Sequence, residues 1–117
     1  MKPNLLHECL KKHGVTVQWR PYMADCGDGW VPLIDTLITE LLKLGWDREL
    51  HQIKEKFGGL RFYVGSATPE MYALICAAED ASLKTCEHCG APGKLDKTGW
   101  WKTVCPEHDQ NDLRGLG

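Results

Sequence analysis

The chain has 117 residues, of which 43% are hydrophobic and 26% are charged, so we expect one globular domain with a modest core. A formal charge of −2 argues against general coating of nucleic acid, which depends on neutralising many phosphates, but it leaves room for a local basic patch. No apolar run is long enough for a membrane span, and the first residues lack a signal-peptide core. We therefore expect a cytoplasmic protein whose six cysteines are free or metal-bound rather than paired in disulfides.

The first part of the chain predicts a helix, a strand and a second helix. Apolar residues on one face predict a short helix over 3–13, and alternating hydrophobic residues predict a half-buried strand over 15–20. A polar, glycine-containing loop follows at 21–29. An apolar stripe then predicts a helix from about 31 to 44, with Pro32 in its first turn.

The segment 50–65 predicts a β-hairpin that turns at Phe57-Gly58-Gly59, because paired glycines supply the positive φ angles of tight turns. The side chains expected to face the core are Ile53, Leu60, Phe62 and Val64. Those expected to face outward are Lys54, Lys56, Arg61 and Tyr63. This outer face is a candidate contact surface for phosphates or for an acidic partner. The alternative is a solvated hairpin face whose charge is balanced by Glu55.

A third helix is expected over 68–84. Thr68 is a good N-cap, Pro69 suits the first helical position, and Glu70 lies near the positive end of the helix dipole. Cys76 stands inside this helix among small residues, so we expect it to be a plain thiol in the core.

The strongest chemical signal follows this helix. Two cysteines separated by two residues are followed, fifteen residues later, by a cysteine and a histidine with the same spacing. Two such pairs each present two donors from one tight turn, which is typical of a zinc site with three cysteines and one histidine. The expected ligands are Cys86, Cys89, Cys105 and His108. Four protein ligands leave no open position, so the sequence predicts a structural Zn²⁺ in a ribbon whose returning strand spans 100–104.

Redox and nucleophilic roles fit this motif less well. A thioredoxin-type cysteine pair opens a helix after a strand, whereas Cys86 follows a predicted helix. A nucleophilic cysteine needs a positioned base, for which the spacing gives no sign. His88 could replace His108 as a ligand, but the Cys105 pair would then be incomplete. We therefore interpret His88 as an exposed polar residue.

Other residues suggest further sites. Asp25 and Asp28 share a loop and could hold a divalent cation, although aspartate is also an ordinary loop residue. The segment 108–112 faintly resembles a histidine–asparagine nuclease motif. Trp100 and Trp101 are adjacent, so in a strand one of them should face outward, where it could anchor a protein interface.

The blocks "GWVPLIDTL", "IKEKFGGLRFYV" and "CEHCGAPG…GWWKTVCPEH" resemble a family of small proteins of phages and prophages. Its members share a KEKFGxLRFY-like block ahead of a CxxCGxPG…GW…C-x2-H zinc element. The match covers roughly 29–108, and residues 1–28 lie outside it. The resemblance brings no established activity with it. It implies a mobile-element context, in which small proteins often block host defences, as anti-CRISPR inhibitors do.

These observations predict an α+β fold with helices packed on a small antiparallel sheet or hairpin. The single domain would comprise a core over 1–85, a zinc-ribbon module over 86–108 and a tail over 109–117. The expected function is that of a non-enzymatic binding protein, an inhibitor of a host defence complex, with a host protein or nucleoprotein complex as its partner. The candidate contact residues are Lys54, Lys56, Arg61, Tyr63, Trp100 and Trp101.

Two alternatives remain open. The first is a nucleic-acid-binding regulator that places the ribbon and the basic hairpin on phosphates. The second is a small metal-dependent nuclease that uses Asp25, Asp28 or the segment 108–112.

Overall fold

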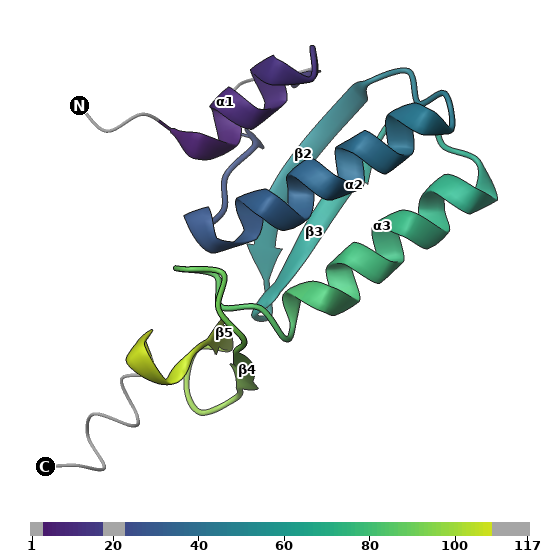
Figure 1. Cartoon of the computed structure of the whole chain (residues 1–117). Helices are drawn as coiled ribbons and strands as arrows, with labels where there is room; N and C mark the ends of the chain where they lie inside the picture. The colour runs from purple at the N-terminus through teal and green to yellow at the C-terminus, as the bar shows by residue number, and fades with distance from the viewer. Residues whose placement is uncertain (1–3, 18–22, 109–117) are drawn as a thin grey trace, which may run out of the picture.

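The computed structural model describes residues 4–17 and 23–108 (Figure 1). Their elements are three helices and two small sheets, so the predicted α+β class is confirmed. The expected strand residues beyond Val17 and the expected tail over 109–117 lie outside the described part. The helices are α1 (Leu5–Lys12), α2 (Val31–Lys43) and α3 (Pro69–Ser82).

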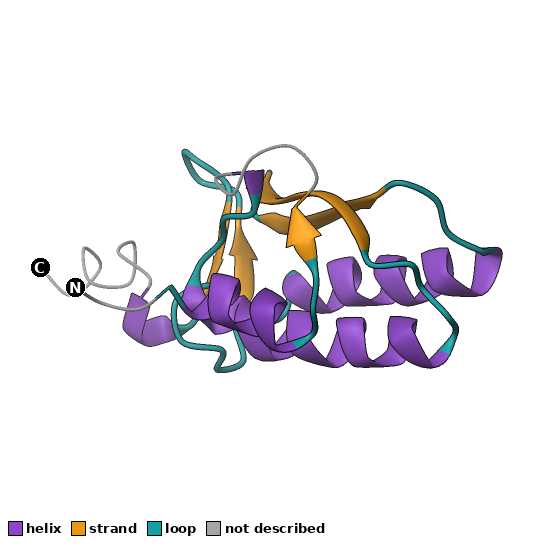
Figure 2. Cartoon of the chain, turned by 90° about the horizontal axis from the view of Figure 1, so that it is seen from above, coloured by secondary structure: helices purple, strands orange, loops and turns teal. Residues whose placement is uncertain are grey.

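The larger sheet has the strand order β1-β2-β3. Its strands are β1 (Thr16–Val17), β2 (Glu49–Lys56) and β3 (Gly59–Val64). The predicted hairpin is confirmed as the antiparallel pair β2–β3, whereas β1 joins β2 in parallel. Parallel neighbours need a crossover connection, and α2 lies in the connection between these two strands. Figure 2 shows the helices gathered on one side of this sheet.

The core lies between the helices and the sheet. Trp30, which precedes α2, is fully buried there, as are side chains from α2, β2 and β3. The fully buried aliphatic residues of these elements are Ile34, Ile38, Leu41, Leu50, Ile53 and Leu60. Within the described ranges, no helix combines the length and the hydropathy needed to cross a bilayer.

The hairpin turns at Phe57 and Gly58, which have positive φ angles of 54° and 81°. The expectation that the paired glycines supply these angles therefore holds for Gly58 and is wrong for Gly59, because Phe57 takes the other position of the turn. The inward face is as predicted for Ile53, Leu60 and Phe62, which are buried, while Val64 is only partly buried. On the outward face, Lys56 and Tyr63 are exposed, and Lys54 lies opposite Arg61 with both half-buried.

Helix α3 begins as predicted, because the Thr68 side chain accepts a hydrogen bond from the Met71 N–H at 3.2 Å. The prediction that Cys76 is a core thiol is wrong, since Cys76 is exposed. Ile75 and Ala78 face the core, and a one-residue step turns the side chain by about 100° around the helix. Small neighbours therefore did not indicate burial at this position.

Two side chains of α3 satisfy the outer edge of β3. The N–H of Leu60 donates to Ser82 Oγ at 2.8 Å, and the N–H of Phe62 donates to Glu79 Oε2 at 3.1 Å. Ser82 is fully buried. An edge strand with unpaired N–H groups is prone to pair with another chain, so these bonds protect β3.

Candidate metal centre

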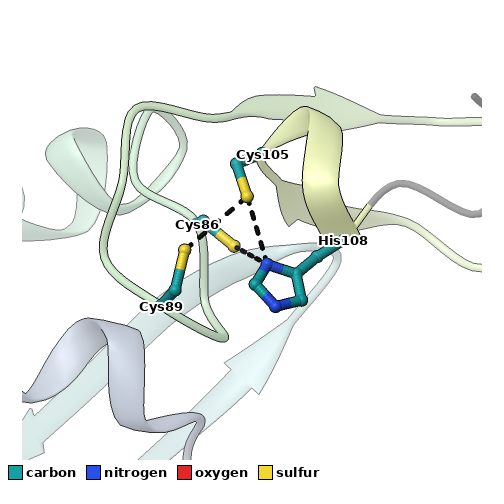
Figure 3. Close-up of side chains that lie close together, drawn as sticks. All are labelled: Cys86, Cys89, Cys105 and His108. Carbon is teal, nitrogen blue, oxygen red and sulfur yellow. Dashed lines mark hydrogen bonds between the residues drawn. The ribbon is translucent and has the colours of Figure 1, made fainter.

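Four side chains from two separate turns lie close together (Figure 3). Cys86 and Cys89 lie in the turn after α3, and Cys105 directly precedes the short 3₁₀ helix Pro106–His108, whose last residue is His108. Their sulfur and nitrogen atoms all lie within 4.8 Å of one another. The residues predicted from spacing are therefore brought together, and they form a group that could hold a metal ion.

The distances fit a tetrahedral ion. Metal–sulfur bonds of about 2.3 Å place two sulfurs of a tetrahedron about 3.8 Å apart. The sulfurs of Cys89 and Cys105 are 3.6 Å apart, and Nδ1 of His108 lies 3.6 Å from Cys86 Sγ and 3.1 Å from Cys105 Sγ. The donor atoms are therefore spaced as ligands of one ion would be.

Backbone hydrogen bonds between residues close in sequence stabilise both turns. The N–H of Gly90 donates to the carbonyl oxygen of Cys86 at 2.9 Å, and Gly90 has a φ of 83° that suits glycine. The N–H of His108 donates to the carbonyl oxygen of Cys105 at 3.0 Å. Each turn thus directs its two donor side chains to the same point.

The electrostatics of the cluster favour thiolates at two of the three cysteines. Burial raises the pKa of Cys86, but backbone N–H groups of Cys105, Cys89 and His88 outweigh burial and lower the pKa to about 6. Burial also raises the pKa of Cys105, and contact with His108 brings it below its usual value. The thiolate is the form that binds metal, so both sulfurs are prepared as ligands.

The turn at Cys86 rests on the loop that precedes α2. The Gly29 N–H donates to the carbonyl oxygen of Glu87 at 2.7 Å, and Trp30 Nε1–H donates to the carbonyl oxygen of Thr85 at 2.9 Å. A Cβ on Gly29 would lie 2.1 Å from the carbonyl oxygen of Cys86, so no side chain fits there. This contact was not predicted from the sequence, although Gly29 and Trp30 open the block "GWVPLIDTL".

The other side of the module, residues 86–108, rests on the hairpin turn. This side is built by the ribbon strands β4 (Lys94–Asp96) and β5 (Lys102–Val104). The buried Thr103 hydroxyl donates to the carbonyl oxygen of Gly58 at 2.7 Å. A Cβ on Gly58 would lie 2.4 Å from Leu95 Cδ1. The candidate metal centre is therefore wedged between two loops of the core.

The predicted strand over 100–104 begins only at Lys102, so this boundary is corrected. Trp100 and Trp101 lie before the strand, and both are exposed, by 82% and 39%. The expected outward-facing tryptophan is therefore present, but its neighbour is exposed as well, because the alternation of side chains applies only within a strand. Phe57 at the hairpin tip is 63% exposed, and its ring centroid lies 6.0 Å from that of Trp101.

We call Lys56, Phe57, Trp100 and Trp101 the aromatic patch. With Glu55 and Gly99 they line a hollow of about 560 Å³. Lys56, Trp100 and Trp101 were among the contact residues predicted from the sequence, whereas Phe57 was not. A large aromatic side chain at a predicted hairpin turn was the signal that could have indicated it.

The remaining candidates lie elsewhere. Lys54 and Arg61 face each other across the hairpin rather than lining the hollow, and Tyr63 is opposite Gln52. Among the described residues, no group of three metal-ligating side chains includes Asp25 or Asp28. The expected nuclease segment 108–112 lies outside the described part beyond its first residue.

Two further residues, His88 and Cys26, lie near these candidates. His88 is exposed, as predicted, with its ring 5.2 Å from that of His108. Burial and the nearby Glu87, Asp25 and Asp28 carboxylates raise the pKa of Cys26 to about 12, which disfavours a reactive thiolate.

Comparison of the chain with protein-family models, curated proteins and solved structures finds no match. The chemistry of the site is therefore argued from its geometry.

Proposed function

We propose that this chain is a non-enzymatic binding protein whose contact surface is held in place by a structural Zn²⁺. The ion is bound by Cys86, Cys89, Cys105 and His108. The observation that carries the proposal is the position of this cluster, which lies between two core loops and beside an exposed aromatic patch. A structural ion there supports a surface rather than a reaction.

The donor set supports zinc. Three sulfurs and one imidazole nitrogen in a tetrahedral arrangement are typical ligands of structural zinc sites, and soft sulfur donors disfavour magnesium and calcium. Four protein ligands leave no position for water or substrate. The ion would therefore stabilise the module 86–108, whose own buried hydrophobic cluster is small, comprising Cys86, Val104 and Cys105.

The aromatic patch supports binding of a partner protein. Interface hot spots are enriched in tryptophan, and a Trp100 side chain that is 82% exposed contributes little to folding. Lys56 Nζ lies 5.6 Å from the Phe57 ring centroid, and Lys97 Nζ lies 4.9 Å from that of Trp101. The patch thus offers apolar area with a cationic rim, which suits a partner surface that is apolar at its centre and acidic around it.

The partner in this proposal is a host protein complex. The sequence blocks that resemble phage proteins include both the hairpin that carries Phe57 and the module that carries the tryptophans. A phage- or prophage-encoded inhibitor that occupies a functional surface of a defence complex in the host cytoplasm needs no chemistry of its own. It needs a rigid patch, which the zinc site supplies.

Affinity capture tests this function. The tagged parent protein and the Trp100→Ala variant are purified from nuclease-treated host lysate, and the captured proteins are compared by mass spectrometry. The matched control is Tyr72→Ala, which removes an exposed aromatic side chain from α3. The proposal expects one stoichiometric complex with the parent and the control, and its loss with Trp100→Ala. Background proteins alone in all three samples would contradict it.

A second candidate, binding to nucleic acid, is favoured by the distribution of charge. Residues 54–61 and 84–108 carry seven basic and four acidic residues, whereas the rest of the chain carries seven basic and twelve acidic residues. These two segments also carry the aromatic patch, and aromatic side chains with lysines can stack bases and contact phosphates. If it operates, affinity for single-stranded nucleic acid falls steeply as salt rises and is lost in the K54A/K56A/R61A variant.

A further inference from the structure

A second group of metal-ligating side chains lies between α1 and α2. Cys9 and His13 are four residues apart, so both side chains lie on one face of α1 and its C-cap. Asp35 comes from the first part of α2. The sulfur, a ring nitrogen and a carboxylate oxygen of these three residues all lie within 4.8 Å of one another.

Backbone and side-chain contacts hold this group in place. The N–H of His13 donates to the carbonyl oxygen of Cys9 at 3.3 Å. The carbonyl oxygen of His13 accepts a hydrogen bond from Arg48 Nε at 2.9 Å. His13 Nε2 lies 2.5 Å from Asp35 Oδ1. Asp35 Oδ2 accepts from Lys12 Nζ at 2.9 Å, so the two carboxylate oxygens serve different partners.

The group is buried at Cys9 and reaches solvent at Asp35. Cys9 is only 7% exposed, and the side chains of His13 and Asp35 are 14% and 36% exposed. An ion could enter from the side of Asp35. The Lys12 side chain is 59% exposed, so its ammonium group can move into water when a cation takes its place.

We propose that Cys9, His13 and Asp35 form a second metal site, which takes a borderline divalent ion of the Zn²⁺ class and joins α1 to α2. One thiolate, one imidazole and one carboxylate suit such an ion, whereas Mg²⁺ and Ca²⁺ prefer oxygen ligands alone. Three protein ligands leave the fourth tetrahedral position to water. On binding, the Cys9 thiol releases its proton to solvent, and the thiolate and carboxylate together balance the two positive charges of the ion.

This site is the weaker of the two. Burial and the Asp35 carboxylate raise the pKa of the Cys9 thiol, so the ion must displace a tightly held proton. The cluster around Cys86 has one more protein ligand. The first equivalent of metal therefore fills the Cys86 cluster, and the second fills the site at Cys9.

The alternative account is that Asp35 pairs only with Lys12 and His13, without any ion. A titration of the full chain, already carrying one equivalent of metal, with Co²⁺ separates the two. The proposal expects a second equivalent to bind, with added thiolate-to-cobalt absorption. It also expects slower hydrogen–deuterium exchange in α1, because the ion joins that helix to α2. Both signals should vanish in Cys9→Ala and Asp35→Asn and persist in the control Cys76→Ser, which removes an exposed thiol from α3.

Asp35→Asn keeps the shape of a partly exposed side chain, so it tests the site even if Cys9→Ala fails to fold. A parent chain that binds one equivalent only overturns the proposal. So does a second equivalent that survives Asp35→Asn with unchanged absorption. Either result leaves the proposed function untouched, because that function rests on the Cys86 cluster and the aromatic patch.

Discussion

Thr103 donates a hydrogen bond through its hydroxyl to the carbonyl oxygen of Gly58 at 2.7 Å, and Thr103 is fully buried. This bond joins β5 of the module 86–108 to the turn of the β2–β3 hairpin. It spans 45 residues of sequence. The hydrogen bond between Thr103 and Gly58 therefore helps to hold both the candidate metal centre and the aromatic patch in place.

Replacing Thr103 with valine tests this support. The substitution leaves the carbonyl oxygen of Gly58 buried without its donor, which costs about 1–3 kcal/mol of the free energy of unfolding. Urea unfolding followed by circular dichroism measures the loss. Thr103→Ser keeps the hydroxyl and should lose clearly less, and equal losses for the two variants would show that the hydrogen bond has no special role.

Gly29→Ala tests the contact on the other side of the module. The added Cβ would lie 2.1 Å from the carbonyl oxygen of Cys86, so the turn must move, at a cost of about 1–3 kcal/mol or more. We expect faster release of metal to a chromophoric chelator. Gly59→Ala is the milder control, because its Cβ meets the flexible end of Leu83 at 3.1 Å. Equal release rates for both variants and the parent would contradict the packing argument.

Removing the metal should unfold the module and spare most of the core. The buried hydrophobic cluster of the module is small, whereas the main cluster spans all three helices and the larger sheet. Hydrogen–deuterium exchange with and without a strong chelator measures this difference. We expect fast exchange in β4 and β5 after chelation, with slow exchange retained in α2 and β2. Unchanged protection of β5 would mean that no ion supports the module.

Trp100→Ala should separate binding from folding. The side chain is 82% exposed, so the free energy of unfolding should change by less than about 0.5 kcal/mol. Loss of an interface hot spot costs about 2 kcal/mol or more, which corresponds to about 30-fold in affinity for the captured complex. Surface plasmon resonance measures the affinity, and an unchanged affinity would remove Trp100 from the contact surface.

The parts of the fold that the sequence predicts are those with local signals. The capping threonine at position 68, the turn at Phe57-Gly58 and the spacing of the ligand pair at Cys86 each act within a few residues. The structure has an N-cap at Thr68, positive φ angles at the turn and a compact cluster of the four predicted ligands. Local physical chemistry therefore suffices for these features.

The contacts that were missed join distant segments. The packing of Gly29 on Cys86 spans 57 positions and leaves only a glycine as its trace in the sequence. Cys76 was misplaced because α3 is apolar around most of its surface, so composition alone could not show which side is buried. Cys9 and His13 show helical spacing, but only the packing of α1 on α2 brings Asp35 to them.

The most direct test of the central claim is native mass spectrometry of the purified protein after a brief chelator wash, in parallel with the Cys89→Ala variant. The account predicts that the folded parent retains a tightly bound zinc ion and captures its partner. The variant should lose that ion and the capture together, because the ion holds the aromatic patch in place. A parent that is folded and captures its partner without any bound metal would contradict the account.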